Sequence, residues 1–214
     1  MQAHDFITRH ESSWHTLWQA LAPNLPASQA LLDELAGRYS EPHRHYHTLE
    51  HLDACLRHLA SVQDQLERPQ EIACALWFHD AIYAVGASDN ELRSADWARQ
   101  ALLAAGGAAD AADRIHAAIM VTRHDQPAQT ADQRLLLDVD LAILGAPPAV
   151  FDAYEQQIVR EYQQVPATQF RSNRRRILQG FLDRAQIYHS ATFMATREAQ
   201  ARANLTRSIA ALAD

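Results

Sequence analysis

Apolar residues recur every three or four positions along most of the chain. One such series consists of Trp14, Leu17, Trp18 and Leu21. This spacing places the apolar side chains on one face of an α-helix, and convincing runs of alternating apolar and polar residues, which would indicate strands, are missing. Segments with helical periodicity cover 28–39, 48–66, 69–80, 90–105, 109–122, 131–144, 149–164, 168–185 and 192–212. The pattern predicts an all-α fold of nine or ten helices.

Turn residues separate these segments without marking a domain boundary. Gly106-Gly107 and "GAPP" at 145–148 lie between expected helices, as glycine and proline do where helices end. No linker is long or biased in composition, and no period of 20–50 residues indicates a repeat protein. A chain of 214 residues is within the usual range for one domain. We therefore expect a single domain over 1–214.

The charge and the cysteines limit the classes of partner and the compartment. The formal net charge is −7, which argues against general nucleic-acid or membrane-surface binding but not against a small phosphorylated ligand. Cys55 and Cys74 lie in apolar-periodic segments and are expected to be buried thiols in a reducing cytosol. The N-terminal residues lack a signal-peptide pattern, and no apolar run approaches the ~20 residues of a membrane span. A cytoplasmic location is expected, and the oligomeric state cannot be read from the sequence.

Histidines are concentrated before and at the start of one expected helix. The segment "HRHYHTLEH" places His47 and His51 four residues apart, so both can lie on one helix face. A second motif, "WFHDAIY", sets His79 and Asp80 among apolar residues, where a charged side chain needs a partner. Imidazole and carboxylate groups are common ligands of divalent metals. The two motifs together favour a metal site over surface or hydrogen-bonded histidines.

Two further carboxylates lie in the apolar segment "LLLDVDLAILG". Asp138 and Asp140 are two residues apart, so they cannot both face the core of the same helix. Either one is a candidate metal ligand. The alternative for each is a surface position or a helix cap.

These motifs, taken in order, resemble the HD superfamily of metal-dependent phosphohydrolases, and most closely its bacterial predicted-phosphohydrolase branch. The resemblance rests on "YHTLEHL", "WFHDAIY", "NELRS" and "LLLDVDLAILG" and covers about residues 39–145. It implies an HD-domain helical bundle with four metal ligands, namely His51, His79, Asp80 and Asp140. One ion is expected, with a second possible, and a mixed His/carboxylate site accepts Mn, Fe, Co, Ni, Zn or Mg.

The resemblance also implies catalytic roles. In the distantly similar cyclic-nucleotide phosphodiesterases, the first histidine of Tyr-His-x-x-x-His protonates the leaving oxygen. By this similarity His47 is the expected general acid, with the alternative that it only orients a ligand or a water. Asp80 is expected to act as a base while it remains a ligand.

Substrate-side candidates surround these positions. Arg44 is a candidate phosphate clamp or a loop ion pair, and Glu91 is a candidate for holding water or substrate. His124 is a further substrate-binding candidate. Together with His116 it would supply ligands for a second ion, provided that the helix ends or kinks between the two residues. The arginine run "RSNRRR" at 171–176 is expected to be a solvated helix face, with an anionic substrate as the alternative.

The expected activity is hydrolysis of a phosphate ester in a nucleotide or other small phosphorylated metabolite by a metal-activated water. Two alternatives remain: a di-iron oxygenase of the same superfamily and a non-catalytic nucleotide-binding regulatory module. The substrate, the metal and the choice between monoester, diester and pyrophosphate cannot be decided from the sequence.

Overall fold

A computed structural model of the protein describes residues 1–212, and these residues form helices joined by turns and loops, with no strand among them. The all-α prediction is therefore confirmed. The ten α-helices are α1 (Ala3–Leu21), α2 (Gln29–Arg38), α3 (Leu49–Ala60), α4 (Pro69–Phe78), α5 (Asn90–Ala104), α6 (Ala109–Met120), α7 (Ala131–Asp140), α8 (Pro148–Glu161), α9 (Ala167–Leu182) and α10 (Ala191–Ala211). Three short 3₁₀ segments are η1 (Gln63–Gln65), η2 (Val121–Arg123) and η3 (Leu141–Gly145). None of the helices within 1–212 is long and apolar enough to cross a membrane.

The chain divides into two compact units. The N-terminal unit comprises Met1–Leu136, and the C-terminal unit begins at Leu137. The division falls inside α7, so one continuous helix belongs partly to each unit. The expectation of a single domain over 1–214 stays a prediction.

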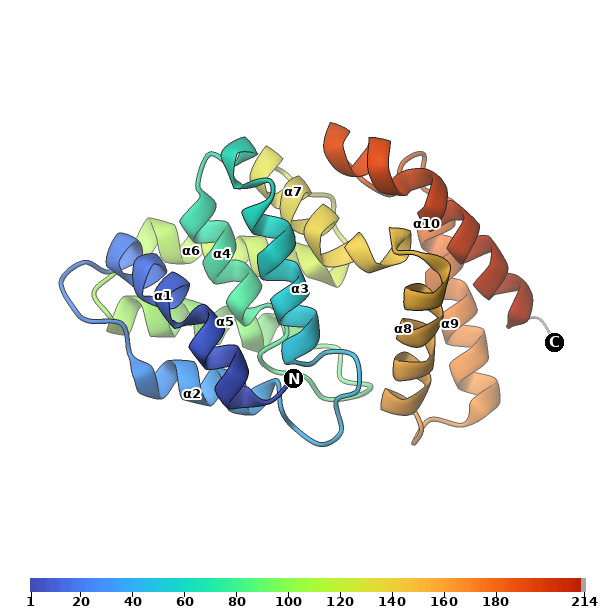
Figure 1. The fold of residues 1–214 in the computed structure, drawn as a ribbon, viewed down its shortest axis with the longest axis horizontal. Helices are drawn as coiled ribbons and strands as arrows, with labels where there is room; N and C mark the ends of the chain where they lie inside the picture. The colour runs from blue at the N-terminus through green and yellow to red at the C-terminus, as the bar shows by residue number, and fades with distance from the viewer. Residues whose placement is uncertain (213–214) are drawn as a thin grey trace. The chain divides into compact units, whose positions relative to one another are not determined.

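Helix α4 is the centre of the N-terminal unit. It contacts α1, α3, α5 and α6 (Figure 1), and its residues from Cys74 to Phe78 are at most 1% exposed. The Trp77 indole meets the rings of Trp14 and Phe6 edge to face, with centroids 5.0 and 5.5 Å away, an arrangement that adds to the stabilisation from apolar burial. Since α4 is held on so many sides, the residues that follow it are held in a fixed place.

The ends of the site-bearing helices have identifiable caps. The Thr48 hydroxyl accepts a hydrogen bond from the Glu50 amide at the start of α3, and Pro69 occupies the first turn of α4, where no N–H is needed. The Asp132 carboxylate accepts hydrogen bonds of 2.9 Å from the amides of both Glu67 and Arg68 just before α4. These caps fix the start of α3, which carries His51, and the start of α4, which leads to His79.

The C-terminal unit is built from η3 and α8 to α10. Helix α10 packs on η3 and α9, and the close approach to η3 occurs at Gly145. A Cβ added at Gly145 would lie 2.6 Å from the Cβ of Arg197 and 2.7 Å from its carbonyl oxygen. The Tyr188 hydroxyl donates to the Leu141 carbonyl and accepts from the Gly145 amide, both at 2.9 Å. This unit therefore depends on a glycine and a buried tyrosine where α10 crosses η3.

Candidate metal centre

Three predicted ligands of the N-terminal unit lie together. His51 is the third residue of α3, and His79 and Asp80 directly follow α4. The Nε2 atoms of His51 and His79 are 3.1 Å apart, and the Oδ2 atom of Asp80 lies 3.2 Å from His79 Nε2 and 3.6 Å from His51 Nε2. The side chains are 4%, 1% and 16% exposed for His51, His79 and Asp80. The structure therefore brings three potential ligand atoms to one buried point.

The tautomer of His79 follows from its other ring nitrogen. His79 Nδ1 lies 2.7 Å from the Leu76 carbonyl oxygen, an acceptor, so Nδ1 carries a proton and donates it. In the neutral ring, Nε2 then carries a lone pair and can only accept a hydrogen bond or bind a cation. This lone pair faces a second imidazole nitrogen and a carboxylate oxygen, so a proton or a cation has to lie among the three atoms. A proton satisfies one of these contacts well, whereas a divalent cation satisfies all three.

The separations also match those that an ion requires. Nitrogen and oxygen ligands lie about 2.0–2.2 Å from a bound transition metal, which places neighbouring ligand atoms about 3.0 Å apart in an octahedral site and about 3.4 Å apart in a tetrahedral one. The distances of 3.1 and 3.2 Å are within this range and that of 3.6 Å is slightly outside it. The residues present therefore fit a divalent metal ion.

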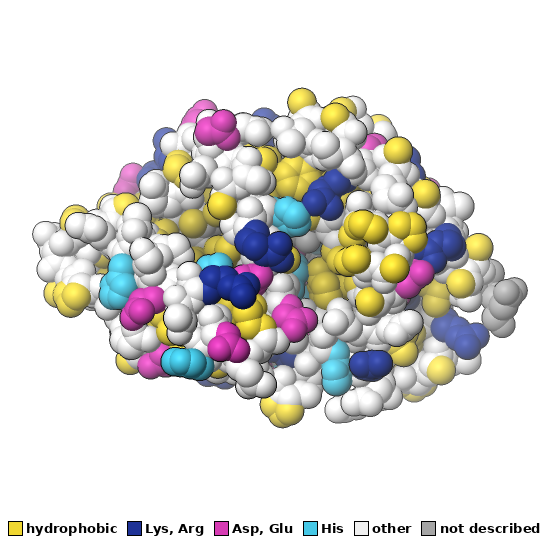
Figure 2. Space-filling model, viewed as in Figure 1, with side chains coloured by type: hydrophobic (Ala, Val, Ile, Leu, Met, Phe, Trp, Pro, Cys, Tyr) yellow, Lys and Arg dark blue, Asp and Glu magenta, His cyan; other side chains and the backbone are white. Residues whose placement is uncertain are grey.

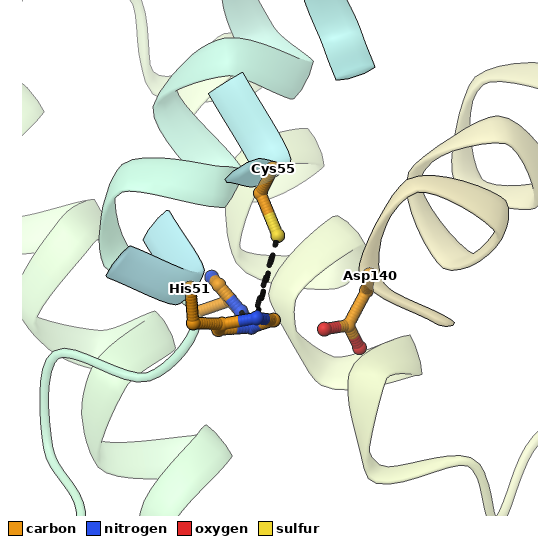
Figure 3. Close-up of side chains that lie close together, drawn as sticks. His51, Cys55 and Asp140 are labelled. Atoms are coloured by element: carbon orange, nitrogen blue, oxygen red, sulfur yellow. Dashed lines mark hydrogen bonds between the residues drawn. The ribbon is translucent and has the colours of Figure 1, made fainter. Parts of the chain in front are cut away.

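A cysteine lies beside the histidines, which the sequence did not associate with the site. Potential ligand atoms of His51, Cys55 and His79 all lie within 4.8 Å of one another, and this buried group could hold a metal ion. Cys55 Sγ is 3.8 Å from His51 Nδ1 and 3.7 Å from Nε2. Figure 3 shows the Cys55 sulfur beside the His51 ring, with a dashed line that marks their contact. In this geometry the thiol packs against the imidazole of His51, and the i, i+4 spacing on α3 is the signal that could have found it.

The electrostatics of Asp80 favour its ionised form. Burial alone would raise the pKa of the carboxyl, but the imidazoles of His79, His47 and His51 outweigh burial and hold the pKa well below its usual range. The carboxylate is therefore available as an anionic ligand across the physiological pH range.

Arg44 has a different position from the one expected of a phosphate clamp. Its side chain is fully buried, and its guanidinium donates to the carbonyl oxygens of His47, Asp80 and Ala81 at 3.2, 2.6 and 3.1 Å and to the Glu41 carboxylate at 3.1 Å. Four of its five N–H groups are thus used within the protein. The ion pair with Glu41 matches the alternative of a loop ion pair, and the hydrogen bonds make Arg44 a positioning residue that ties the segment after α4 to the approach to α3. Its role as a phosphate clamp stays a prediction.

Tyr39 supports the same segment, and sequence reasoning missed it. Its hydroxyl donates to the Trp77 carbonyl and accepts from the Asp80 amide, both at 3.2 Å. Burial raises the pKa of Tyr39 well above its usual value, so the hydroxyl keeps its proton. The Arg44 guanidinium also lies over the Tyr39 ring, 5.3 Å from its centroid. No local motif indicates this role, because the two partners, the Trp77 carbonyl and the Asp80 amide, are about forty residues away.

The predicted general acid lies at the same site. The His47 ring packs against Tyr83 with centroids 4.3 Å apart and lies 5.9 Å from the His51 ring. The His43 ring lies nearly parallel to the Tyr83 ring, with centroids 6.4 Å apart. The His47 ring is therefore a neighbour of the proposed ligand His51. Its role in proton transfer stays a prediction.

Glu91 and His124 lie in the electrostatic surroundings of Asp80. Burial, with the negative charge of Asp80 adding to it, raises the pKa of Glu91, while Arg123 and His124 partly oppose this. Helix α6 ends at Met120, as the expected break requires, and His124 follows η2 with φ of 58°, a left-handed conformation that is uncommon outside glycine. Their substrate-side roles stay predictions.

His116 offers no support for a second ion. Its Nε2 lies 3.1 Å from the Asp96 carboxylate, on α5, at a partly exposed position. This contact accounts for His116 as a link between α5 and α6.

The two candidate carboxylates of α7, Asp138 and Asp140, have different surroundings. Asp138 is fully buried and accepts hydrogen bonds from the amides of His189 and Ser190 at 2.8 and 2.7 Å. Asp138 caps the start of α10, so its carboxylate already has partners within the C-terminal unit, and its role as the alternative ligand stays a prediction. Asp140 is the last residue of α7 and belongs to the C-terminal unit; its role as a ligand stays a prediction.

Comparisons of the chain with models of protein families, with curated proteins and with solved structures gave no match. The geometry of the site is therefore the structural basis for a function.

Proposed function

We propose that the protein is a metal-dependent hydrolase of a phosphate ester in a nucleotide or other small phosphorylated metabolite. The observation that supports this most is the convergence of His51 Nε2, His79 Nε2 and Asp80 Oδ2 within 3.1–3.6 Å at a buried point. The order and spacing of these residues resemble the HD superfamily, in which the same donor types hold a metal.

The proposed ligands are His51, His79, Asp80 and Asp140, the last from the resemblance alone. When bound, a divalent ion would lower the pKa of a water molecule and offset negative charge on a phosphoryl oxygen. Mixed imidazole and carboxylate donors are compatible with several divalent metals, so the metal is left to direct analysis.

The remaining steps belong to this chain's own side chains. His47, adjacent to His51 and packed on Tyr83, would donate a proton to the leaving oxygen of the ester. Glu91, whose pKa is raised, would hold a water or a substrate hydroxyl through its carboxyl group. Arg44 and Tyr39 would act at a distance, because they fix the backbone of Asp80.

The test is a metal analysis joined to a substrate screen. Purified protein would be depleted of metal, reloaded with each candidate ion and assayed on nucleoside monophosphates, cyclic nucleotides and sugar phosphates. We expect hydrolysis of at least one class, lost on metal removal and restored by one or more ions. His79→Ala should lower kcat/KM by at least about 100-fold together with the metal content.

The matched control is His15→Ala, which removes an exposed histidine of α1. It should keep both metal and activity. Hydrolysis that persists unchanged in metal-free protein would overturn the proposal, as would a His79→Ala variant that is folded by circular dichroism and fully active. Two irons per chain with oxygen consumption would favour the oxygenase instead.

A further inference from the structure

The arginine run of α9 lines a groove in the C-terminal unit. An open, shallow pocket of about 550 Å³ is bordered by Thr168, Arg171, Ser172, Arg175, Arg176, Gln179 and Leu212. Six of these seven residues lie on α9, three or four positions apart, so they share one helix face. The lining is therefore three guanidinium groups, two hydroxyl groups, one amide and one apolar side chain.

The run "RSNRRR" is divided by the structure into an inner and an outer part. Arg174 is buried, donates to the Tyr154 hydroxyl at 2.6 Å and forms an ion pair with Glu155. Arg171, Arg175 and Arg176 are exposed on the groove side. The single buried arginine anchors α9 to α8, and this anchor sets the orientation of the other three.

In the part of the chain that the structure describes, the outer arginines form no ion pair, whereas most arginines of this protein do. Over α1 and α3, Figure 2 shows basic and acidic side chains interspersed, and there Asp53 pairs with both Arg9 and Arg57. Among residues 1–212, by contrast, no carboxylate forms an ion pair with any of the three arginines that line the groove. Within the described residues, the Asp183 carboxylate accepts a hydrogen bond from the Gln179 amide at the end of the groove.

We propose that this groove binds a ligand that carries two or more phosphate groups, such as a nucleoside triphosphate or inorganic triphosphate. Three positive charges at one concave surface of a chain with net charge −7 mark a local site for an anion. The planar guanidinium fork pairs with two phosphate oxygens at once, and hydroxyl groups donate to the remaining oxygens. The proposal uses residues 168–212 alone and does not depend on the proposed hydrolase.

The chemistry favours oligophosphate over other anions. All nineteen basic residues of the chain are arginine, so the groove presents fixed forks rather than mobile ammonium groups. A cavity of about 550 Å³ is within the usual range of ~300–1,000 Å³ for small-ligand sites. Leu212 offers apolar contact to a nucleobase. A nucleotide should therefore bind more tightly than inorganic triphosphate.

The experiment is calorimetric titration of the full chain with sodium triphosphate, and in a second arm with ATP, at 50 mM and 300 mM NaCl. We expect saturable binding that weakens with salt. Arg175→Gln should raise Kd about tenfold, and Arg171→Gln/Arg175→Gln should raise it further. Arg160→Gln, which removes an exposed arginine of α8, is the matched control and should leave Kd unchanged. Each variant keeps the proposed metal centre unchanged. Binding of triphosphate or ATP at that centre would therefore contribute equally to every titration.

Three results would overturn the inference. One is the absence of binding up to 1 mM triphosphate, and another is an unchanged Kd in the double variant. The third is equal affinity for a glutamate-rich peptide, which would assign the groove to acidic proteins instead. A larger Kd in Arg175→Lys, which keeps the charge and loses the fork, would support phosphate recognition. Thermal unfolding of each variant would verify that α9 still packs.

Discussion

At the scale of single residues, the site separates groups that would touch an ion from groups that hold those ligands in place. His79 is directed by the hydrogen bond from its Nδ1 to the Leu76 carbonyl, and Asp80 by Arg44 and Tyr39 through its backbone. The residue types of His51, His79 and Asp80 could be predicted as ligands because their side-chain chemistry is specific. The role of Arg44 could not, because a guanidinium suits phosphates and carbonyl oxygens equally well.

The role of Arg44 leads to a prediction about stability. Arg44→Lys loses the multiple hydrogen bonds to carbonyl oxygens, since an ammonium cannot reach them all. We expect the free energy of unfolding, measured by urea denaturation, to fall by about 2–4 kcal/mol. Arg93→Lys, at an exposed position of α5, should change it by less than about 0.5 kcal/mol. A variant with normal stability and only a raised KM would instead support a role of Arg44 as a phosphate clamp.

At the scale of helices, the periodicity predicted where the helices lie but placed several ends too far along. The segment 131–144 was expected as one helix, yet α7 ends at Asp140 and η3 follows. Similarly, α3 ends at Ala60 rather than 66. Apolar spacing continues through a 3₁₀ turn, so it cannot reveal the change. The groups that shape this region lie about fifty residues further on: the His189 amide donates to the Asp138 carboxylate, and Arg197 of α10 lies against Gly145.

The contact at Gly145 leads to a prediction for the C-terminal unit. Gly145→Ala places a methyl group against the backbone of Arg197, so α10 must shift. We expect a loss of about 1–3 kcal/mol in the free energy of unfolding. Gly180→Ala is the matched control, because no atom lies within 4 Å of its added Cβ, and in the interior of α9 it should stabilise by about 0.5–1 kcal/mol. Equal effects of the two substitutions would contradict the close packing of α10 on η3.

At the scale of the whole molecule, the all-α class followed from periodicity, whereas the division into two units did not. The division falls inside α7, where the sequence has no glycine, proline or polar linker to mark it. It also separates the proposed ligands along the chain, because His51, His79 and Asp80 belong to the N-terminal unit and Asp140 to the C-terminal one. An ion bound by all four would therefore link the unfolding of both units, and an ion bound by three would stabilise one.

This difference can be measured by thermal unfolding with and without the metal that restores activity. At a metal concentration about 100 times Kd, binding adds about 2.7 kcal/mol to the stability of whatever unfolds together with the site. If Asp140 is a ligand, amide hydrogen exchange should slow in both units on metal addition, and Asp140→Asn should confine the slowing to residues before Leu137. Asp152→Asn removes a half-exposed carboxylate of the C-terminal unit and should behave like the unaltered protein. Slowing confined to the N-terminal unit in the unaltered protein would remove Asp140 from the ligand set and leave the three-residue site.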